Sequence, residues 1–130
     1  MTRPVRTVPV LPVPSIDEAL AFYLPLDGIA LLWREGDRAA AIGTHEAALV
    51  LKAERGDLGP TEAILNVTDA DRAADHWARA GADIAEPVST RPWGMREFAL
   101  RDPFGNLLRV GHPDDSAADF SGFTFPDTAS

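Results

Sequence analysis

Hydrophobic and polar positions in the first half of the chain follow an order that predicts one strand, one helix and three further strands. Thr7–Val13 is mostly apolar and predicts a strand. Ser15 followed by Glu18 has the spacing of a capping box, and apolar residues then recur at helical spacing until Pro25, which a helix interior does not accommodate. Turn residues then separate three predicted strands: Ile29–Trp33, Ala39–Ile42 and Ala47–Leu51.

The second half repeats this order. Glu62–Val67 predicts a strand, and Thr68 or Asp69 is a candidate cap for a helix that runs through Ala80 and ends at Gly81. Three strands follow, with a turn at Asp102–Asn106 between the last two: Ile84–Val88, Glu97–Leu100 and Leu107–Gly111.

The two halves also share residues at an offset of 54 positions. Val10–Val13 aligns with Ile64–Val67, and Tyr23 aligns with Trp77. Matching element order makes an internal repeat the simplest interpretation. We therefore predict an α+β fold of two βαβββ modules. We expect residues 1–112 to form a single domain, with modules at 7–53 and 61–112 and a linker at 54–60, and residues 113–130 to form an acidic tail.

Composition supports a globular protein and excludes several chemistries. Of the 130 residues, 45% are hydrophobic and 25% are charged, which is ordinary for one packed domain. The chain contains no cysteine, which excludes disulfides, a thiolate nucleophile and cysteine-ligated zinc. No apolar run has the length of a membrane span, so we expect a cytoplasmic protein.

The charge balance narrows the partners. Twelve Lys and Arg residues against 20 Asp and Glu residues give a net charge of −8. Nucleic acids and anionic membranes bind proteins through clustered positive charge, so neither is expected as a partner of this acidic chain. A cationic small molecule would be attracted, although acidity is also common in proteins that merely need to stay soluble. No glycine-rich phosphate loop or Gly-x-Ser-x-Gly elbow is present.

Two segments resemble the bleomycin-resistance proteins of the vicinal oxygen chelate superfamily, which also holds glyoxalase I and the extradiol dioxygenases. They are Val8–Leu11, with the helix end at Phe22-Tyr23, and the long stretch Pro92–Asn106. The resemblance covers Thr7 to Gly111. It implies a homodimer with two ligand clefts at its interface and exchange of the first strand at a proline hinge. Pro9 stands at the hinge position, although an ordinary edge-strand proline remains the alternative.

The resemblance also locates the four metal-ligand positions of the superfamily's enzymes. They fall near Val8, Val50, Glu62 and Arg109. Two of these are aliphatic and one is a permanent cation, whereas divalent metals need converging oxygen and nitrogen donors. We therefore expect no metal, no cofactor and no catalytic residues.

The same resemblance supplies candidate ligand-binding residues. Trp33 and Trp93 stand at aromatic positions that flank the family's cleft, where a planar ligand stacks, and Gly94 adjoins the second. A core or interface role is the alternative for Trp33. Arg38 replaces a second aromatic of the family, and its charge opposes a cationic ligand, which places bleomycin itself in doubt.

Three further residues belong to predicted strands of the second module. Glu62 and Asn66 are candidates for orienting a ligand by hydrogen bonds, or they are outward-facing strand residues. Phe98 either lines the cleft or fills the core.

The expected function is that of a non-enzymatic protein that sequesters a planar, neutral or cationic small molecule, such as an antibiotic. The alternatives are a divergent metal-dependent lyase, isomerase or dioxygenase of the same superfamily, and a carrier module for a metabolite.

Overall fold

The fold consists of two four-stranded sheets, each accompanied by one helix. The computed structural model describes residues 2–3, 7–53 and 60–114. Module one contains β1 (Val10–Val13), α1 (Ile16–Tyr23), β2 (Ala30–Glu35), β3 (Ala39–Gly43) and β4 (Ala48–Ala53). Module two contains β5 (Glu62–Asn66), α2 (Ala70–Arg79), β6 (Asp83–Thr90), β7 (Met95–Arg101) and β8 (Leu107–Pro113). The predicted α+β fold of two βαβββ modules is confirmed. The predicted linker falls largely, and the predicted acidic tail almost wholly, outside the described residues.

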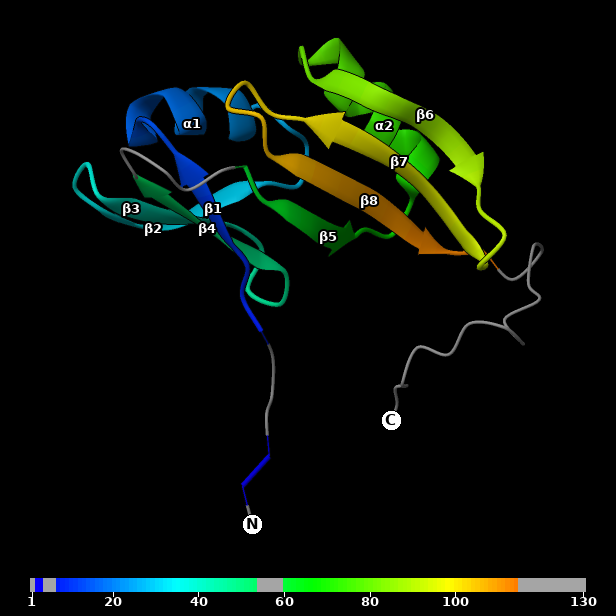
Figure 1. The fold of residues 1–130 in the computed structure, drawn as a ribbon, viewed down its shortest axis with the longest axis horizontal. Coiled ribbons are helices and arrows are strands. Elements are labelled where there is room, and N and C mark those ends of the chain that lie inside the picture. Colours follow the sequence, from blue (N-terminus) through cyan, green and yellow to red (C-terminus); the bar gives the residue numbers. More distant parts are fainter. Residues whose placement is uncertain (1, 4–6, 54–59, 115–130) are drawn as a thin grey trace.

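Both sheets have the same topology (Figure 1). The strand orders are β1-β4-β3-β2 in sheet A and β5-β8-β7-β6 in sheet B. The first strand of each module lies parallel to the last, and the other pairings are antiparallel. The internal repeat seen in the sequence is therefore a repeat of strand pairing as well as of element order.

Some predicted boundaries differ from the structure. The first strand begins at Val10 rather than Thr7, although the carbonyl of Pro9 still accepts from the N–H of Val50 at 2.9 Å. The strand predicted at Ile84–Val88 extends to Thr90, through register shifts near Glu86 that interrupt its alternation of side chains.

The helix caps form as the sequence predicts. The Ser15 side chain accepts from the Glu18 N–H at 3.2 Å, and the Asp69 carboxylate accepts from the Arg72 N–H at 3.0 Å. Gly81 follows α2 with φ of +100°, a conformation that favours glycine. Among the described residues, no helix is long and apolar enough to cross a membrane.

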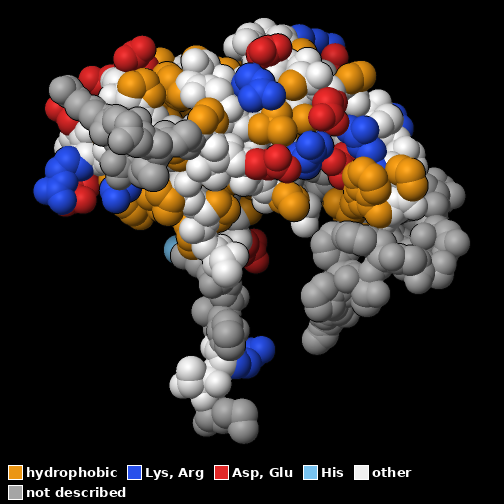
Figure 2. All heavy atoms as spheres, viewed as in Figure 1, with side chains coloured by type: hydrophobic (Ala, Val, Ile, Leu, Met, Phe, Trp, Pro, Cys, Tyr) orange, Lys and Arg blue, Asp and Glu red, His pale blue; other side chains and the backbone are white. Residues whose placement is uncertain are grey.

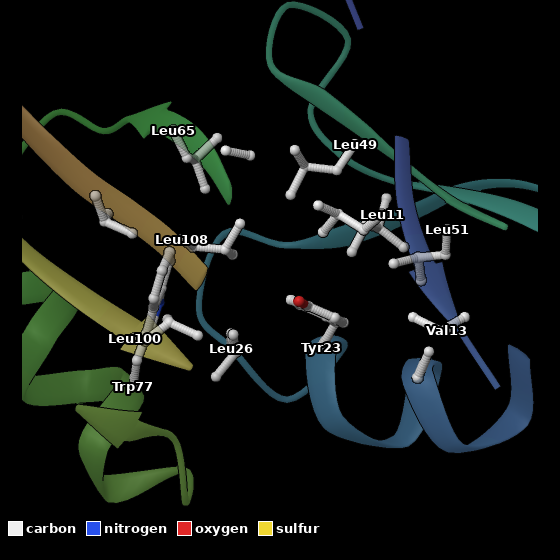
Figure 3. Close-up of a cluster of buried hydrophobic side chains, with 14 of the residues drawn as sticks. Leu11, Val13, Tyr23, Leu26, Leu49, Leu51, Leu65, Trp77, Leu100 and Leu108 are labelled. Carbon is white, nitrogen blue, oxygen red and sulfur yellow. The ribbon is translucent and has the colours of Figure 1, made fainter. Parts of the chain in front are cut away.

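One hydrophobic core joins the two modules. Each helix packs on one face of its sheet, and inward side chains from both sheets meet between them (Figure 3). The buried residues labelled in the figure come from both modules: Leu11, Val13, Tyr23, Leu26, Leu49, Leu51, Leu65, Trp77, Leu100 and Leu108. The face of each sheet opposite its helix remains open.

Buried polar contacts connect the modules beside this core. The Tyr23 hydroxyl donates to Asp102 Oδ2 at 2.7 Å, and Asn106 Nδ2 donates to Asp102 Oδ2 at 2.9 Å and to the Pro12 carbonyl at 2.8 Å. Burial, with the Asp102 charge and hydrogen bond, raises the pKa of Tyr23 well above its usual value of 10.0. Because these partners lie far apart in sequence, the two modules are expected to fold as one unit.

Candidate ligand-binding face

The open face of sheet A is apolar. Strand pairing places Val10, Val50, Ala41 and Trp33 next to one another across the four strands. The neighbours of Ala41 on β3 point to the opposite side and pack in the core. Trp33 is 48% exposed, so this row offers a large indole and aliphatic surface to a ligand or a partner.

The open face of sheet B is charged. Arg109 Nε donates to Glu62 Oε2 at 2.8 Å, and its guanidinium also lies 3.4 Å from Glu86 and 3.8 Å from Glu97. Arg91 donates to Glu86 at 3.1 Å. The hydrogen bond to Glu62 raises the pKa of Arg109. Figure 2 shows acidic and basic side chains interleaved over this part of the surface, with hydrophobic side chains beside them.

This cluster has an excess of negative charge and one unused donor. Three carboxylates, from Glu62, Glu86 and Glu97, share two guanidiniums. The buried Nε of Arg91 has no hydrogen-bond partner within the described residues, and it lies 3.9 Å from Glu97 Oε2. A buried donor without a partner is costly, so an acceptor from a ligand or water would be stabilised there.

Trp93 is fixed at the end of this charged face by the turn between β6 and β7. The Gly94 N–H donates to the Arg91 carbonyl at 3.0 Å, and Gly94 has φ of +86°, which an L side chain rarely adopts. Trp93 Nε1 donates to Glu97 Oε1 at 3.2 Å, while Glu97 is only 7% exposed. Trp93 as a whole is 39% exposed, so a held aromatic residue remains accessible beside the carboxylates.

Of the other predicted ligand-binding residues, some lie on the open face of sheet B and others lie elsewhere. Glu62 and Asn66 lie on the open face of sheet B, in register with β8. Arg38 is in the turn after β2, where its side chain is 82% exposed and lies 3.9 Å from Glu35. Phe98 fills the core rather than lining the open face, because it points toward α2 and packs edge-on to Trp77 with 5.9 Å between the ring centroids.

Two contributors to this face were missed by the sequence analysis. Glu97 and Arg91 both belong to the charged cluster on sheet B, but the prediction singled out the neighbouring aromatic residue Trp93 instead. The available signal was the alternation along β7, since Glu97 necessarily faces away from Phe98. Trp33 lies on β2 of sheet A and Trp93 lies in the turn that joins β6 and β7 of sheet B, and no ring contact joins them within the described chain.

The residues at the four family metal positions do not fit a metal. Val8 and Val50 offer no donor, and Arg109 is a cation whose guanidinium binds the carboxylate of Glu62. In the described part of the chain, no three His, Asp or Glu side chains are grouped so as to hold a metal ion. The arrangement can present aromatic surface, charge and hydrogen bonds to a ligand.

Two βαβββ modules, each with one helix-covered and one open sheet face, define a protein of the vicinal oxygen chelate fold. The family model of the Glyoxalase/Bleomycin resistance protein/Dioxygenase superfamily matches residues 5–110. The chain belongs to this superfamily, which confirms the resemblance noted in its sequence.

Solved structures agree on the fold. A bleomycin-binding protein from bleomycin-producing Streptomyces verticillus, complexed with copper(II)-bleomycin, is 26% identical, with a TM-score of 0.66 over 85% of this chain and 97% of that one. A bleomycin resistance determinant encoded on transposon Tn5 is 21% identical, with a TM-score of 0.73 over 86% and 99%. Lactoylglutathione lyase from Agrobacterium tumefaciens is 18% identical, with a TM-score of 0.69 over 85% and 95%. No curated protein sequence matches the chain.

Proposed function

We propose that this protein binds and sequesters a planar, neutral or cationic small molecule, as bleomycin-binding proteins do, in the cytoplasm and without chemical turnover. The observation that carries the proposal is Trp93, whose half-exposed ring is held by Glu97 next to a charged open face. A stacked aromatic pair contributes about 0.5–1.5 kcal/mol beyond its area burial. A ring already held in place also loses little conformational freedom on binding.

Charge supports the cationic character of the ligand. The open face of sheet B holds one more carboxylate than guanidinium, and the whole chain carries −8. The unpaired Nε of Arg91 favours a ligand that also carries a hydrogen-bond acceptor near Trp93. Electrostatic attraction of this kind acts mainly on the association rate and weakens as salt rises.

A homodimer would complete the cleft. Trp33 and Trp93 are both predicted to bind the ligand, yet Trp33 lies on sheet A and Trp93 lies in a turn of sheet B of the same chain. Pairing the apolar face of sheet A with the charged face of a partner's sheet B would place both tryptophans at one cleft. The same pairing would remove the exposed Val10 and Trp33 from water.

Binding without turnover is supported by the donor set. A lyase or dioxygenase of this superfamily needs metal ligands where this chain has Val8, Val50 and Arg109. The likeness to lactoylglutathione lyase concerns the fold and does not supply those ligands.

The proposal is tested by titrating bleomycin, and then other planar cations, into the purified protein by calorimetry. The wild type is expected to bind, and Trp93→Ala to weaken binding by at least about tenfold. Trp77→Phe is the matched control, since this core tryptophan lies on the helix side of sheet B. Absence of binding for every planar cation tried would contradict the proposal. Expression under bleomycin challenge then separates a resistance protein from a metabolite carrier, which would give no protection.

A further inference from the structure

A cavity lies where the two modules meet, and neither Trp93 nor Glu97 lines it. It has a volume of about 570 Å³ and is built from four segments. They are the residues before β2, the turn joining β3 and β4, which lies below β5 in Figure 1, the end of β5, and the first turns of α2. We call it the seam pocket. Its volume is in the range of small-molecule sites.

The floor of the seam pocket is apolar. Ile29, Leu65, Ala73 and Trp77 line it. Trp77 Nε1 already donates to the Asp27 carbonyl at 3.0 Å, so the indole offers the pocket apolar surface rather than a free donor. A ligand that fits this floor therefore carries a hydrophobic group.

Two opposite charges that have no partner among the described residues line the seam pocket. Glu46 comes from module one and Arg72 from module two, and neither side chain forms an ion pair or hydrogen bond within the described part of the chain. By contrast, Arg34, Arg79 and Arg96 each hold a carboxylate at 2.8 Å. The pocket thus keeps one guanidinium and one carboxylate available on an apolar site.

We propose that the seam pocket binds a small zwitterion, an α-amino acid with an apolar side chain. The Arg72 guanidinium receives the ligand carboxylate in its planar two-donor geometry, and Glu46 receives the ammonium. The apolar side chain of the ligand packs against Ile29 and Ala73, the two partly exposed residues of the floor.

The surrounding charges argue against simpler ligands. Asp27 and Asp69 also line the seam pocket, so a ligand with only negative charge meets three carboxylates and one guanidinium. A ligand with only positive charge leaves Arg72 without a partner. Asp69 already caps α2, and Asp27 lies 4.0 Å from His76, so Glu46 is the carboxylate of this pocket for which the described residues supply no partner.

The inference is tested by calorimetry on the full chain with three probes: L-phenylalanine, its amide, which keeps only the ammonium, and its N-acetyl derivative, which keeps only the carboxylate. L-phenylalanine is expected to bind with a dissociation constant below about 10 mM, and more tightly than either derivative. Arg72→Gln should weaken L-phenylalanine by about tenfold or more and leave the amide within about twofold. Glu46→Gln should weaken both the amide and L-phenylalanine.

Arg79→Gln is the matched control, because Arg79 lies on the same helix but pairs with Asp75 outside the pocket. It should leave all three affinities unchanged. The inference is overturned if L-phenylalanine does not bind, or if Arg72→Gln and Glu46→Gln leave its binding unchanged. Trp93→Ala separates the two sites: loss of amino-acid binding in that variant places the ligand on the open face and overturns the seam pocket, while the proposed function stands.

Discussion

The two sheets have the same topology, but their open faces differ in chemistry. At corresponding pairings of the first and last strands, sheet A places Val10 beside Val50, whereas sheet B places Ile64 beside Arg109. Sheet A continues the apolar row to Trp33, while sheet B surrounds Arg109 with Glu62, Glu86 and Glu97.

The difference shows which side of a module is constrained by packing. On the helix side, both modules contribute to one core, and side chains there must fill space at native density. On the open side no helix imposes that demand, so the chemistry is free to follow a ligand or partner. The open face of sheet A is suited to contact a flat apolar surface, and the open face of sheet B is suited to bind charged and hydrogen-bonding groups.

The largest expected effect is a loss of stability when the buried polar contacts between the two modules are removed. Asp102→Ala removes the acceptor of the Tyr23 hydroxyl and of the Phe104 and Asn106 N–H groups. Leaving these buried donors unpaired is expected to lower the free energy of unfolding by about 3 kcal/mol. Urea unfolding should still show one transition for both modules. Asp37→Ala is the control, because this side chain is 93% exposed. An equally small loss of unfolding free energy in Asp102→Ala and Asp37→Ala would contradict a shared core.

A second variant tests how sheet B holds its aromatic residue. Glu97→Leu removes the acceptor of Trp93 Nε1 and leaves Arg91 and Arg109 without that carboxylate. Affinity for a planar cation is expected to fall by about tenfold or more. Glu97→Gln keeps an acceptor for the indole and should recover part of the loss. Equal losses in the two variants would indicate that charge, and not the position of Trp93, controls binding.

The pH dependence of stability sharpens the role of Tyr23. Its folded-state pKa is raised by burial and by Asp102, so the folded protein keeps the phenol proton where the unfolded chain loses it. Stability from this group is complete below pH 10 and falls as pH rises above about 10, by about 1.4 kcal/mol per pH unit. Tyr23→Phe should remove this part of the slope in urea titrations at alkaline pH. An unchanged slope would show that Tyr23 does not couple folding to pH.

The smallest effect is expected from the exposed edge of the charged face. Glu62→Gln weakens an ion pair with Arg109 whose carboxylate side chain is 55% exposed, so stability should change by less than about 1 kcal/mol. The association rate of a cationic ligand should fall, and the difference from wild type should shrink as salt rises. Stopped-flow fluorescence at two salt concentrations measures it. A difference that does not depend on salt would argue against electrostatic attraction.

Much of the fold could be predicted because its signals are local. The caps at Ser15 and Asp69 and the repeat of Val10–Val13 at Ile64–Val67 lie within short windows of sequence. The two-module arrangement follows once each window is assigned to an element. The irregular end of β6 was missed because register shifts interrupt the two-residue alternation on which the prediction relied.

The candidate site was only partly predictable for a physical reason. Trp93 and Glu62 were found through the family resemblance, but the face on which Phe98 lies could not be decided, since nearly every position of β7 is buried. The seam pocket was not predicted, because it arises where the β3–β4 turn of one module meets α2 of the other. Contacts of this kind depend on packing between segments that are distant in the chain, so they leave no local pattern in the sequence.

The central claim is that the ligand needs the apolar face of sheet A and the charged face of sheet B together, supplied by two chains. It is tested most directly by mixing Trp33→Ala protein with Trp93→Ala protein, allowing the subunits to exchange, and titrating bleomycin. If each cleft combines Trp33 of one chain with Trp93 of its partner, each mixed dimer has one intact cleft and one that lacks both rings. The account predicts that the mixture recovers tight binding at one site per mixed dimer, although neither variant binds tightly alone. A mixture that binds no better than its separate components, while the wild type binds, would contradict it.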